Sequence, residues 1–351
     1  MKNGDTGKMK KSIAVILLIS AVLLSACSSK EPQKVQKDEK KLAVTETKEV
    51  IDEYYLKMQS DERPIAVMID NDVAASRPQM GLESAYMVYE IIVEGGASRF
   101  MALFKEHTLD KVGPVRSSRH YFLDYALEHD AVYCHAGWSP QASRDISNLG
   151  VNNINGIMGV DGRAFWRDNT YDRSWHNLYS GVDKLYEMAA STKGYRTVTE
   201  VKHLGYHKQD TDLKSENIAQ SIDIAYSQFY RVSYEYDSEK KVYKRYVDGA
   251  YHMSQTGECL TAKNIILYKV RNYTLNDGEN KGRQNIENIG SGTGYYITNG
   301  KVVNINWSKP SRNAKTLYTL EDGTELILNP GNTFVQIVPS NMNIGITGNI
   351  Q

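Results

Sequence analysis

The stretch Val-Gly-Pro-Val-Arg-Ser-Ser-Arg-His-Tyr-Phe, residues 112–122, joins a turn to a helix. Gly113-Pro114 indicates the turn, because glycine accepts positive φ and proline fixes φ. The apolar residues that follow recur at helical spacing, which predicts a helix with one buried face. Arg116 and Arg119 fall in the first turn of this predicted helix, where their charge opposes the helix dipole.

Two interpretations of Arg116 and Arg119 remain open. A bound anion would explain the arginines, because the unpaired N–H groups at a helix start also favour negative charge. Alternatively, the arginines form structural ion pairs with Glu90, Glu94 or Asp124.

The N-terminus has the three-part pattern of a secretory signal peptide. Lysines precede an apolar run from Ile13 to Leu24, and small residues follow it. The run is too short for an ordinary membrane-spanning helix, so residues 1–26 are predicted to be a cleaved signal. Either Met1 or Met9 fits as the start of this segment.

The signal ends in Leu24-Ser25-Ala26-Cys27, which matches the bacterial lipobox. In this motif the Cys27 thiol carries a diacylglyceryl group, with palmitate as a typical acyl chain, and Cys27 becomes the new N-terminus. The pattern predicts a lipoprotein on the outer face of the cell membrane, because two acyl chains hold a protein stably. Residues 27–62 are then the lipidated cysteine and a flexible, Lys/Glu-rich tether.

The charge of the mature chain argues against nucleic acid as a partner. Over 351 residues, 42 Lys and Arg balance 42 Asp and Glu. Removing residues 1–26 takes away four lysines and one aspartate, a charge of +3, and leaves −3 from zero. A weakly acidic chain carries no basic stripe of the kind that nucleic-acid binders use. The two remaining cysteines, Cys134 and Cys259, form no disulfide scaffold.

The folded part is predicted to have two domains. Short apolar runs at 65–69 and 98–104 alternate with helical patterns, which predicts an α/β or α+β domain with a mixed sheet over residues 63–221. From about residue 222, alternating Tyr, Val, Ile and Thr with frequent Asp-Gly and Asn-Gly pairs predicts a small, mostly antiparallel β-domain over 222–351. Asn299-Gly300 is the strongest hairpin signal.

A second cluster of polar and aromatic residues follows the strand predicted at 131–136. His135 and Trp138 lie at its carboxyl end, where open α/β sheets place ligands. Ser139 is a good N-cap and Pro140 a good first residue for the next helix. Residues 161–179 form a long irregular stretch that contains further candidates.

A set of short segments is spread along the chain: Arg77-Pro78-Gln79, Glu94-Gly95, Arg99-Phe100, residues 113–117, His135, residues 137–140, Phe165-Trp166-Arg167, His176-Asn177, Tyr243, Asn264, Gly292, Gly300, Trp307 and Pro330-Gly331. Together these segments resemble the YerB-like lipoprotein family of Gram-positive bacteria, which has a domain of unknown function. In relatives a proline precedes the His176-Asn177 pair, where this chain has Trp175. The resemblance implies an N-terminal α/β part, a C-terminal β part and an extracytoplasmic address. The resemblance covers nearly all of the chain after Pro64.

The leading hypothesis is an accessory lipoprotein that binds an anionic or glycan ligand of the cell envelope, such as a wall polymer, or an envelope protein. Guanidinium groups suit phosphate and carboxylate, and tryptophans suit sugar rings. The candidate ligand-binding residues are Arg99, Arg116, Arg119, His135, Trp138, Arg167, His176 and Asn177. Whether they converge on one cleft separates this hypothesis from structural ion pairing.

The alternative is a cell-envelope hydrolase in which His135 and His176 act as acid/base groups with Glu94 assisting. The sequence leaves open whether the protein is an enzyme. It contains no His-Glu-x-x-His pattern, and a zinc site would need three or four ligands, so no metal and no cofactor is predicted. Each histidine could equally be a hydrogen-bonded structural residue.

Overall fold

The structure is a computed structural model that describes residues 51–72, 77–171 and 175–348. The predicted signal peptide, Cys27 and most of the predicted tether lie outside these residues. In the described part of the chain, no helix has both the length and the hydropathy to span a membrane.

The described residues form four α-helices: α1 (Glu53–Gln59), α2 (His120–Glu128), α3 (Pro140–Asn148) and α4 (Val182–Glu187). The predicted start of α3 is confirmed, because Pro140 is its first residue and the Ser139 hydroxyl accepts a hydrogen bond from the amide of Ala142 at 3.2 Å. Helix α1 lies within the predicted tether, so the packed part of the chain begins before residue 63.

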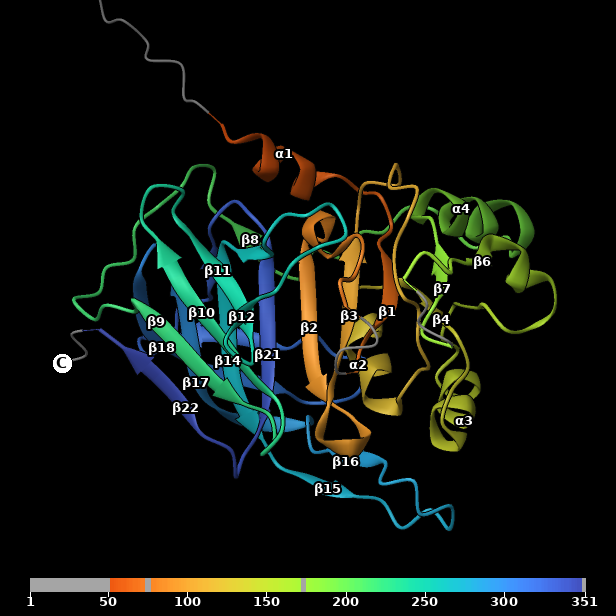
Figure 1. Cartoon of the computed structure of the whole chain (residues 1–351). Coiled ribbons are helices and arrows are strands. Elements are labelled where there is room, and N and C mark those ends of the chain that lie inside the picture. Colours follow the sequence, from red (N-terminus) through yellow and green to blue (C-terminus); the bar gives the residue numbers. More distant parts are fainter. Residues whose placement is uncertain (1–50, 73–76, 172–174, 349–351) are drawn as a thin grey trace, which may run out of the picture. The chain divides into compact units, whose positions relative to one another are not determined.

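A mixed sheet of ten strands runs through the body in the order β19-β18-β17-β14-β21-β2-β3-β1-β4-β5 (Figure 1). The apolar runs that predicted strands at 65–69 and 98–104 are β1 and β3, and the mixed sheet is confirmed. The strand bounds are β1 (Ile65–Asn71), β2 (Met87–Ile92), β3 (Ser98–Phe104), β4 (Val132–His135), β5 (Asn153–Asn155), β14 (Asn264–Val270), β17 (Gly290–Thr298), β18 (Lys301–Lys309), β19 (Leu317–Leu320) and β21 (Thr333–Pro339).

A second, antiparallel sheet confirms the β-rich C-terminal part. Its order is β12-β11-β10-β9-β22, with β13 paired to β11. Its bounds are β9 (Ser221–Ala225), β10 (Arg231–Asp237), β11 (Val242–Val247), β12 (Ala250–Tyr251), β13 (Thr261–Ala262) and β22 (Ile344–Thr347). Three short pairs complete the structure: β6 (Phe165–Arg167) with β7 (Leu178–Ser180), β8 (Gly205–Tyr206) with β20 (Ile327–Leu328), and β15 (Asn272–Thr274) with β16 (Gln284–Ile286).

Strands from both sides of residue 222 share the ten-stranded sheet. Strand β21 lies between β14 and β2 and pairs in parallel with both. The pairing with β2 runs from Met87 opposite Thr333 to Ile91 opposite Ile337. The contacts place the described residues on both sides of residue 222 in one compact unit.

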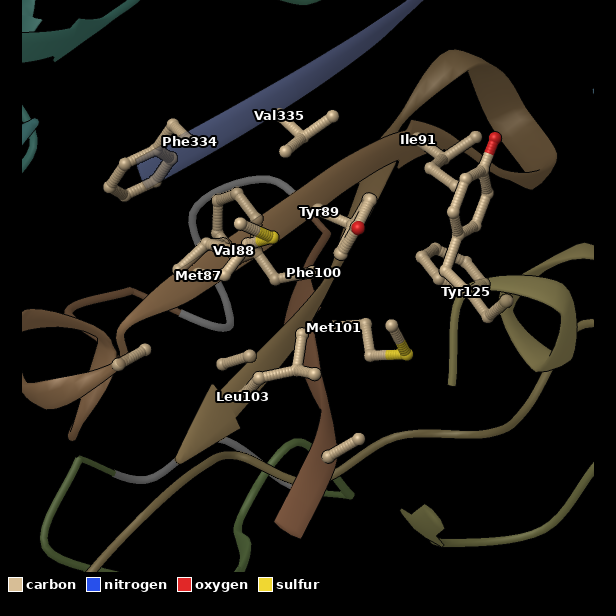
Figure 2. Packing of buried hydrophobic residues seen from close by; sticks show 14 of the residues in the cluster. Met87, Val88, Tyr89, Ile91, Phe100, Met101, Leu103, Tyr125, Phe334 and Val335 are labelled. Carbon is tan, nitrogen blue, oxygen red and sulfur yellow. The ribbon is translucent and has the colours of Figure 1, made fainter. Parts of the chain in front are cut away.

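The two faces of β2 bury different partners, because successive side chains of a strand point to opposite faces. Tyr89 faces α2, where its ring stacks on Tyr125 with centroids 4.7 Å apart. Figure 2 shows this packing together with Met101, the residue opposite Tyr89 on β3. Glu90 faces the other way and meets Arg245 of the second sheet.

The strand directions define two opposite edges of the sheet, one at each end of its strands. Strands β1 and β4 are parallel, and β3 is antiparallel to both β1 and β2. The C-terminal ends of β1, β2 and β4 therefore lie along one side of the sheet, the carboxyl edge, and their N-terminal ends lie along the opposite side, the amino edge. Helix α1 packs at the amino edge, where the Tyr54 hydroxyl donates to the carbonyl of Tyr86, just before β2 begins. In Figure 1, α1 lies at the top and the β15–β16 arm at the bottom.

Candidate functional site

The carboxyl edge is opened by the segment that carries Arg116. Strands β1 and β4 pair directly only from Ile65 to Val67. Beyond that point residues 115–118 lie between them, because the Arg116 amide donates to the carbonyl of Met68 at 2.9 Å and the Arg116 carbonyl accepts from Ala136 at 3.0 Å. The backbone on both sides therefore fixes the position from which the Arg116 side chain leaves the sheet.

Helix α2 starts later than the sequence predicted. It begins at His120, with Arg119 at its N-cap, and Arg116 lies in the extended segment before it. The expectation that both arginines occupy the first helical turn is wrong. The reason is that backbone groups of residues 115–118 form hydrogen bonds with the segments of β1 and β4 on either side and so cannot form helical hydrogen bonds. The helix therefore begins only after residue 118.

A cavity of about 480 Å³ lies at this edge. It brings together several residues that the sequence predicted, namely Glu94, Arg99, Arg116, Arg119 and Trp138. Side chains that were not among the predicted ligand-binding residues also line it: Asp72, Ser117, Trp175, Lys281 and Arg283. The cavity is therefore built from the ends of β1 and β2, the start of β3, the segment before α2 and the β15–β16 arm.

All three guanidinium nitrogens of Arg119 donate hydrogen bonds, two of them to Glu94. Its Nε and Nη2 atoms donate to the two Glu94 carboxylate oxygens at 2.6 and 2.9 Å, and Nη1 donates to the carbonyl of Ser118 at 2.8 Å. Burial alone would raise the pKa of Glu94, but the hydrogen bonds and charge of Arg119 outweigh it and hold the pKa below its usual value. Arg119 therefore fits the structural interpretation.

We expect Arg119→Gln to lower the free energy of unfolding at pH 7 by roughly 1.5–3 kcal/mol, the range for hydrogen bonds to charged groups. Because the folded pKa of Glu94 is lowered, this stabilisation is complete above the unfolded pKa of about 4.3 and disappears as pH falls through the folded pKa. Urea unfolding of both proteins between neutral and acid pH measures it.

The control for this variant is Arg144→Gln, since Arg144 is exposed and forms no ion pair with an acid of the described residues. Its stability should match that of the native chain at every pH. If the gap between the native chain and Arg119→Gln does not narrow in acid, Glu94 is not the partner that matters.

Arg116 forms an ion pair and a cation–π contact, but its two outer nitrogens have no hydrogen-bond partner among the described residues. Its Nε lies 2.9 Å from Asp70 Oδ2, at an angle that suits an ion pair and not an aligned hydrogen bond. The guanidinium carbon stands 4.3 Å from the ring centre of Trp175, a cation–π contact. No hydrogen bond from its two outer nitrogens to any described residue is found, so these donors are available to the cavity that Arg116 lines.

Arg99 is the most buried cation of the site, with 4% of the residue exposed. It lies opposite Asp70 in the β1–β3 register, and its Nη1 donates to the carbonyl of Ser117 at 2.7 Å. Its Nε is buried and has no hydrogen-bond partner within the described residues. Burial, and then the nearby charge of Arg119, lower the pKa of Arg99 to about 10.

Asp70 ties Arg116 to His176. The His176 Nδ1 atom lies 2.6 Å from Asp70 Oδ2, the oxygen that also faces Arg116. Burial would raise the pKa of Asp70, but the hydrogen bond from His176 and the charges of Arg116 and Arg99 lower it, so the carboxylate stays ionised. The Asp70–His176 contact fixes the orientation of the imidazole.

His135 is buried beneath the site instead of lining the cavity. Its Nδ1 lies 2.8 Å from the carbonyl oxygen of Gly137 and its Nε2 lies 3.2 Å from Oδ1 of Asn153. Burial lowers the pKa of His135 to about 4. Its ring lies 5.6 Å from that of Trp138, so it supports the tryptophan at the cavity wall.

Arg167 and Asn177 contact each other, not the cavity. The Arg167 Nη1 donates to the side-chain oxygen of Asn177 at 2.5 Å, and the Asn177 amide donates to Asn169 at 2.5 Å. Arg167 and Asn177 lie at the β6–β7 pair, and neither residue lines the cavity at the carboxyl edge.

Comparison with known proteins places the chain among relatives along almost its whole length. Residues 54–196 match the "Protein of unknown function (DUF3048) N-terminal domain", and residues 222–335 match the corresponding C-terminal domain. The chain is 30% identical over 336 residues to "Putative lipoprotein YerB" of Bacillus subtilis (strain 168), covering 94% of this chain and 96% of that protein. The chain belongs to the YerB-like family.

A solved structure supports the same assignment. The crystal structure of the YerB protein from Bacillus subtilis matches with a TM-score of 0.70 and 29% identity, over 81% of this chain and 94% of that chain. The YerB-like fold therefore combines an N-terminal mixed sheet with helices and a C-terminal part of mostly antiparallel strands.

Sequence reasoning missed part of the candidate site. Asp70 could have been found from the sequence, because it is the carboxylate that directly follows the strand predicted at residues 65–69. Lys281 and Arg283 gave no local signal, because the arm that carries them comes from the β-rich part of the chain. Trp175 was seen as an aromatic residue, but its contact with Arg116 depends on the tertiary structure.

Within the described residues, one group of side chains lies close enough to hold a metal: Glu128, His129 and His203, with ligand atoms within 4.8 Å of one another. Glu128 and His129 already use their ligand atoms in other contacts, whereas both ring nitrogens of His203 have no hydrogen-bond partner among the described residues. Glu128 Oε2 accepts from Lys309 at 2.7 Å, and both ring nitrogens of His129 contact tyrosine hydroxyls, at 3.1 and 2.9 Å. A metal would displace these bonds beside an ammonium group, so the cluster fits a buried polar network better.

Proposed function

We propose that this YerB-like chain is a lipid-anchored extracytoplasmic protein that binds an anionic group of a cell-envelope ligand in the cavity at the carboxyl edge. The observation that carries the proposal is the pair Arg99 and Arg116, whose guanidinium groups line the cavity with donors left uncommitted. Guanidinium forks suit phosphate and carboxylate groups. A wall polymer, a peptide stem or an acidic envelope protein supplies such groups.

We expect Arg116→Gln and Arg99→Gln each to weaken the binding of inorganic phosphate about ten- to a hundredfold, because a hydrogen bond to a charged group is worth roughly 1.5–3 kcal/mol. Titration calorimetry of the chain from residue 28 onward, at constant ionic strength, measures the affinity. Thermal melts without ligand establish that each variant is folded.

The matched control is Arg231→Gln, an exposed arginine on β10 in the second sheet. It should leave phosphate binding unchanged. Equal weakening by Arg231→Gln, or the absence of any effect at Arg116 and Arg99 in folded variants, would reject the cavity as an anion site.

The anchor is proposed from the lipobox and from the name of the Bacillus subtilis relative. Replacing Cys27 by alanine removes the thiol that carries the diacylglyceryl group. We expect this variant to lose metabolic labelling with palmitate and to leave the membrane fraction. A variant that is still labelled and sediments with membranes would overturn the lipidation site.

A second candidate function is a cell-envelope hydrolase, and the 2.6 Å contact between Asp70 and His176 favours it. A carboxylate that orients an imidazole is the arrangement of a general base. In this alternative His176 would act with Glu94, with His135 behind the site, although Arg119 already holds both Glu94 oxygens. Loss of peptidoglycan-fragment release in His176→Gln would support the hydrolase, and no release by the native chain would exclude it.

A further inference from the structure

The second sheet covers only part of one face of the ten-stranded sheet. Paired residues of neighbouring strands point to the same face, so the registers define one row of side chains across that face. The row consists of Glu90 on β2, Gln336 on β21, Leu267 on β14, Tyr295 on β17 and Asn304 on β18. Gln336 is covered by the second sheet, because its Nε2 donates to the Tyr234 hydroxyl of β10 at 3.1 Å. Tyr295 is 36% exposed and Asn304 is exposed, so the cover ends before β17.

A cavity of about 410 Å³ lies over these uncovered strands, and we call it the sheet-face cavity. Strand β22, at the edge of the second sheet, borders it through Ile344. A smaller cavity of about 140 Å³ shares Tyr295, Asn304 and Ile344 with it, so the two are contiguous. The larger one alone falls within the range of small-molecule binding sites, roughly 300–1,000 Å³.

The sheet-face cavity is lined by polar side chains at alternate positions of adjacent strands. Thr293 lies opposite Asn306, and Tyr295 lies opposite Asn304, in the β17–β18 register. Lys269 on β14 lines the same cavity. Apart from Asn304, none of these side chains has a hydrogen-bond or ion-pair partner among the described residues. Their polar groups are therefore available to a ligand.

The chemistry of the lining narrows the class of ligand. The charged residues that line the cavity are Lys269 and Glu321, and Asn304 Nδ2 donates to Glu321 Oε1 at 2.9 Å. One cation and one carboxylate give no preference for an anion. An apolar ligand would leave the amides and hydroxyls without partners. A peptide strand has no free backbone edge to join, because β17 is paired on both sides.

We infer that the sheet-face cavity binds a neutral oligosaccharide. The amides of Asn304 and Asn306 each supply donors and an acceptor, which match sugar hydroxyls because these also donate and accept. Tyr295 supplies an aromatic ring for the C–H face of a sugar and a hydroxyl at its tip. This site shares no lining residue with the proposed anion site and does not depend on it.

Titration calorimetry of the chain from residue 28 onward tests the inference with three tetrasaccharides. Cellotetraose and chitotetraose are neutral, whereas tetragalacturonate has a carboxylate on every ring. At least one neutral tetramer should bind, and it should bind more tightly than tetragalacturonate. Tyr295→Ala should weaken this binding about tenfold, through loss of the ring contact. Asn306→Ala should weaken it about three- to tenfold, through loss of neutral hydrogen bonds.

The matched control is Tyr273→Ala, because Tyr273 is 45% exposed on β15 and does not line the cavity. Both this variant and Arg116→Gln should bind the neutral tetramer as the native chain does. Thermal melts establish folding, and Asn306→Ala, at an exposed position, carries the test if Tyr295→Ala does not fold.

Three results would overturn the inference: no binding of either neutral tetramer, tighter binding of tetragalacturonate, or undiminished binding in the folded Tyr295 and Asn306 variants. Phosphate binding is measured separately on the same proteins. Its loss in Arg116→Gln concerns the proposed anion site alone, so the two proposals fail independently.

Discussion

Replacing Arg245 by methionine is expected to lower the free energy of unfolding by about 3–5 kcal/mol, because it leaves Glu90 buried without a countercharge. Both side chains are 0% exposed, and Arg245 Nη2 lies 2.9 Å from Glu90 Oε2. The same guanidinium donates to the Tyr234 hydroxyl at 2.6 Å and to Nδ1 of His252 at 3.0 Å. The variant breaks all of these contacts.

The size of this effect follows from where the pair lies. Glu90 is on β2 and Arg245 on β11, so the ion pair joins the ten-stranded sheet to the second sheet. Burial would lower the pKa of Arg245, but the charge of Glu90 and the neighbouring tyrosines outweigh it and raise the pKa, so Arg245 stays charged. The melting temperature should fall by on the order of 10 °C.

An exposed ion pair provides the control. Arg271 and Glu287 are 3.1 Å apart with side chains 70% and 42% exposed, so Arg271→Met should cost no more than about 1 kcal/mol. The double variant Glu90→Gln/Arg245→Met should recover part of the lost stability, because no buried charge is left alone. Equal melting of Arg245→Met and Arg271→Met would contradict a stabilising role for the buried pair.

Separate fragments 51–217 and 218–348 are expected not to fold on their own. Cutting the chain between them exposes the edge of β2 where β21 pairs with it, along residues that are buried throughout. It also separates Glu90 from Arg245. An unpaired, apolar strand edge favours aggregation, so each fragment alone should be insoluble or unfolded.

Co-expression tests this expectation. The two fragments, with a tag on one of them, should co-purify and show the circular dichroism of the intact chain, and the intact chain should unfold in one transition. A soluble, monomeric fragment 51–217 with a cooperative melt would show that the N-terminal part is an independent domain.

Features that depend only on residues adjacent in the sequence were predictable. The Ser139 cap and Pro140 start of α3 depend on a few adjacent residues, and so does the Asn299-Gly300 turn between β17 and β18, where both residues have positive φ. The start of α2 was not predictable in this way, because backbone hydrogen bonds to β1 and β4 delay it.

The sequence predicted which residues could form the candidate site, but not which arginine pairs with which carboxylate. Glu94 was one of three carboxylates offered for Arg116 and Arg119, and the structure pairs it with Arg119. The other two, Glu90 and Asp124, pair with Arg245 and Arg312, which lie far away in sequence.

The sequence by itself determined the YerB-like family, the mixed sheet with its β-rich C-terminal part, and the predicted lipobox at Cys27, because motifs, apolar periodicity and turn residues are local properties. Only the tertiary structure decided that Arg119 is committed to Glu94 while Arg99 and Arg116 keep free donors at the cavity. The reason is physical: the pairing of a charge depends on which strands of a ten-stranded sheet become neighbours, and non-local pairing leaves no periodic signal along the chain.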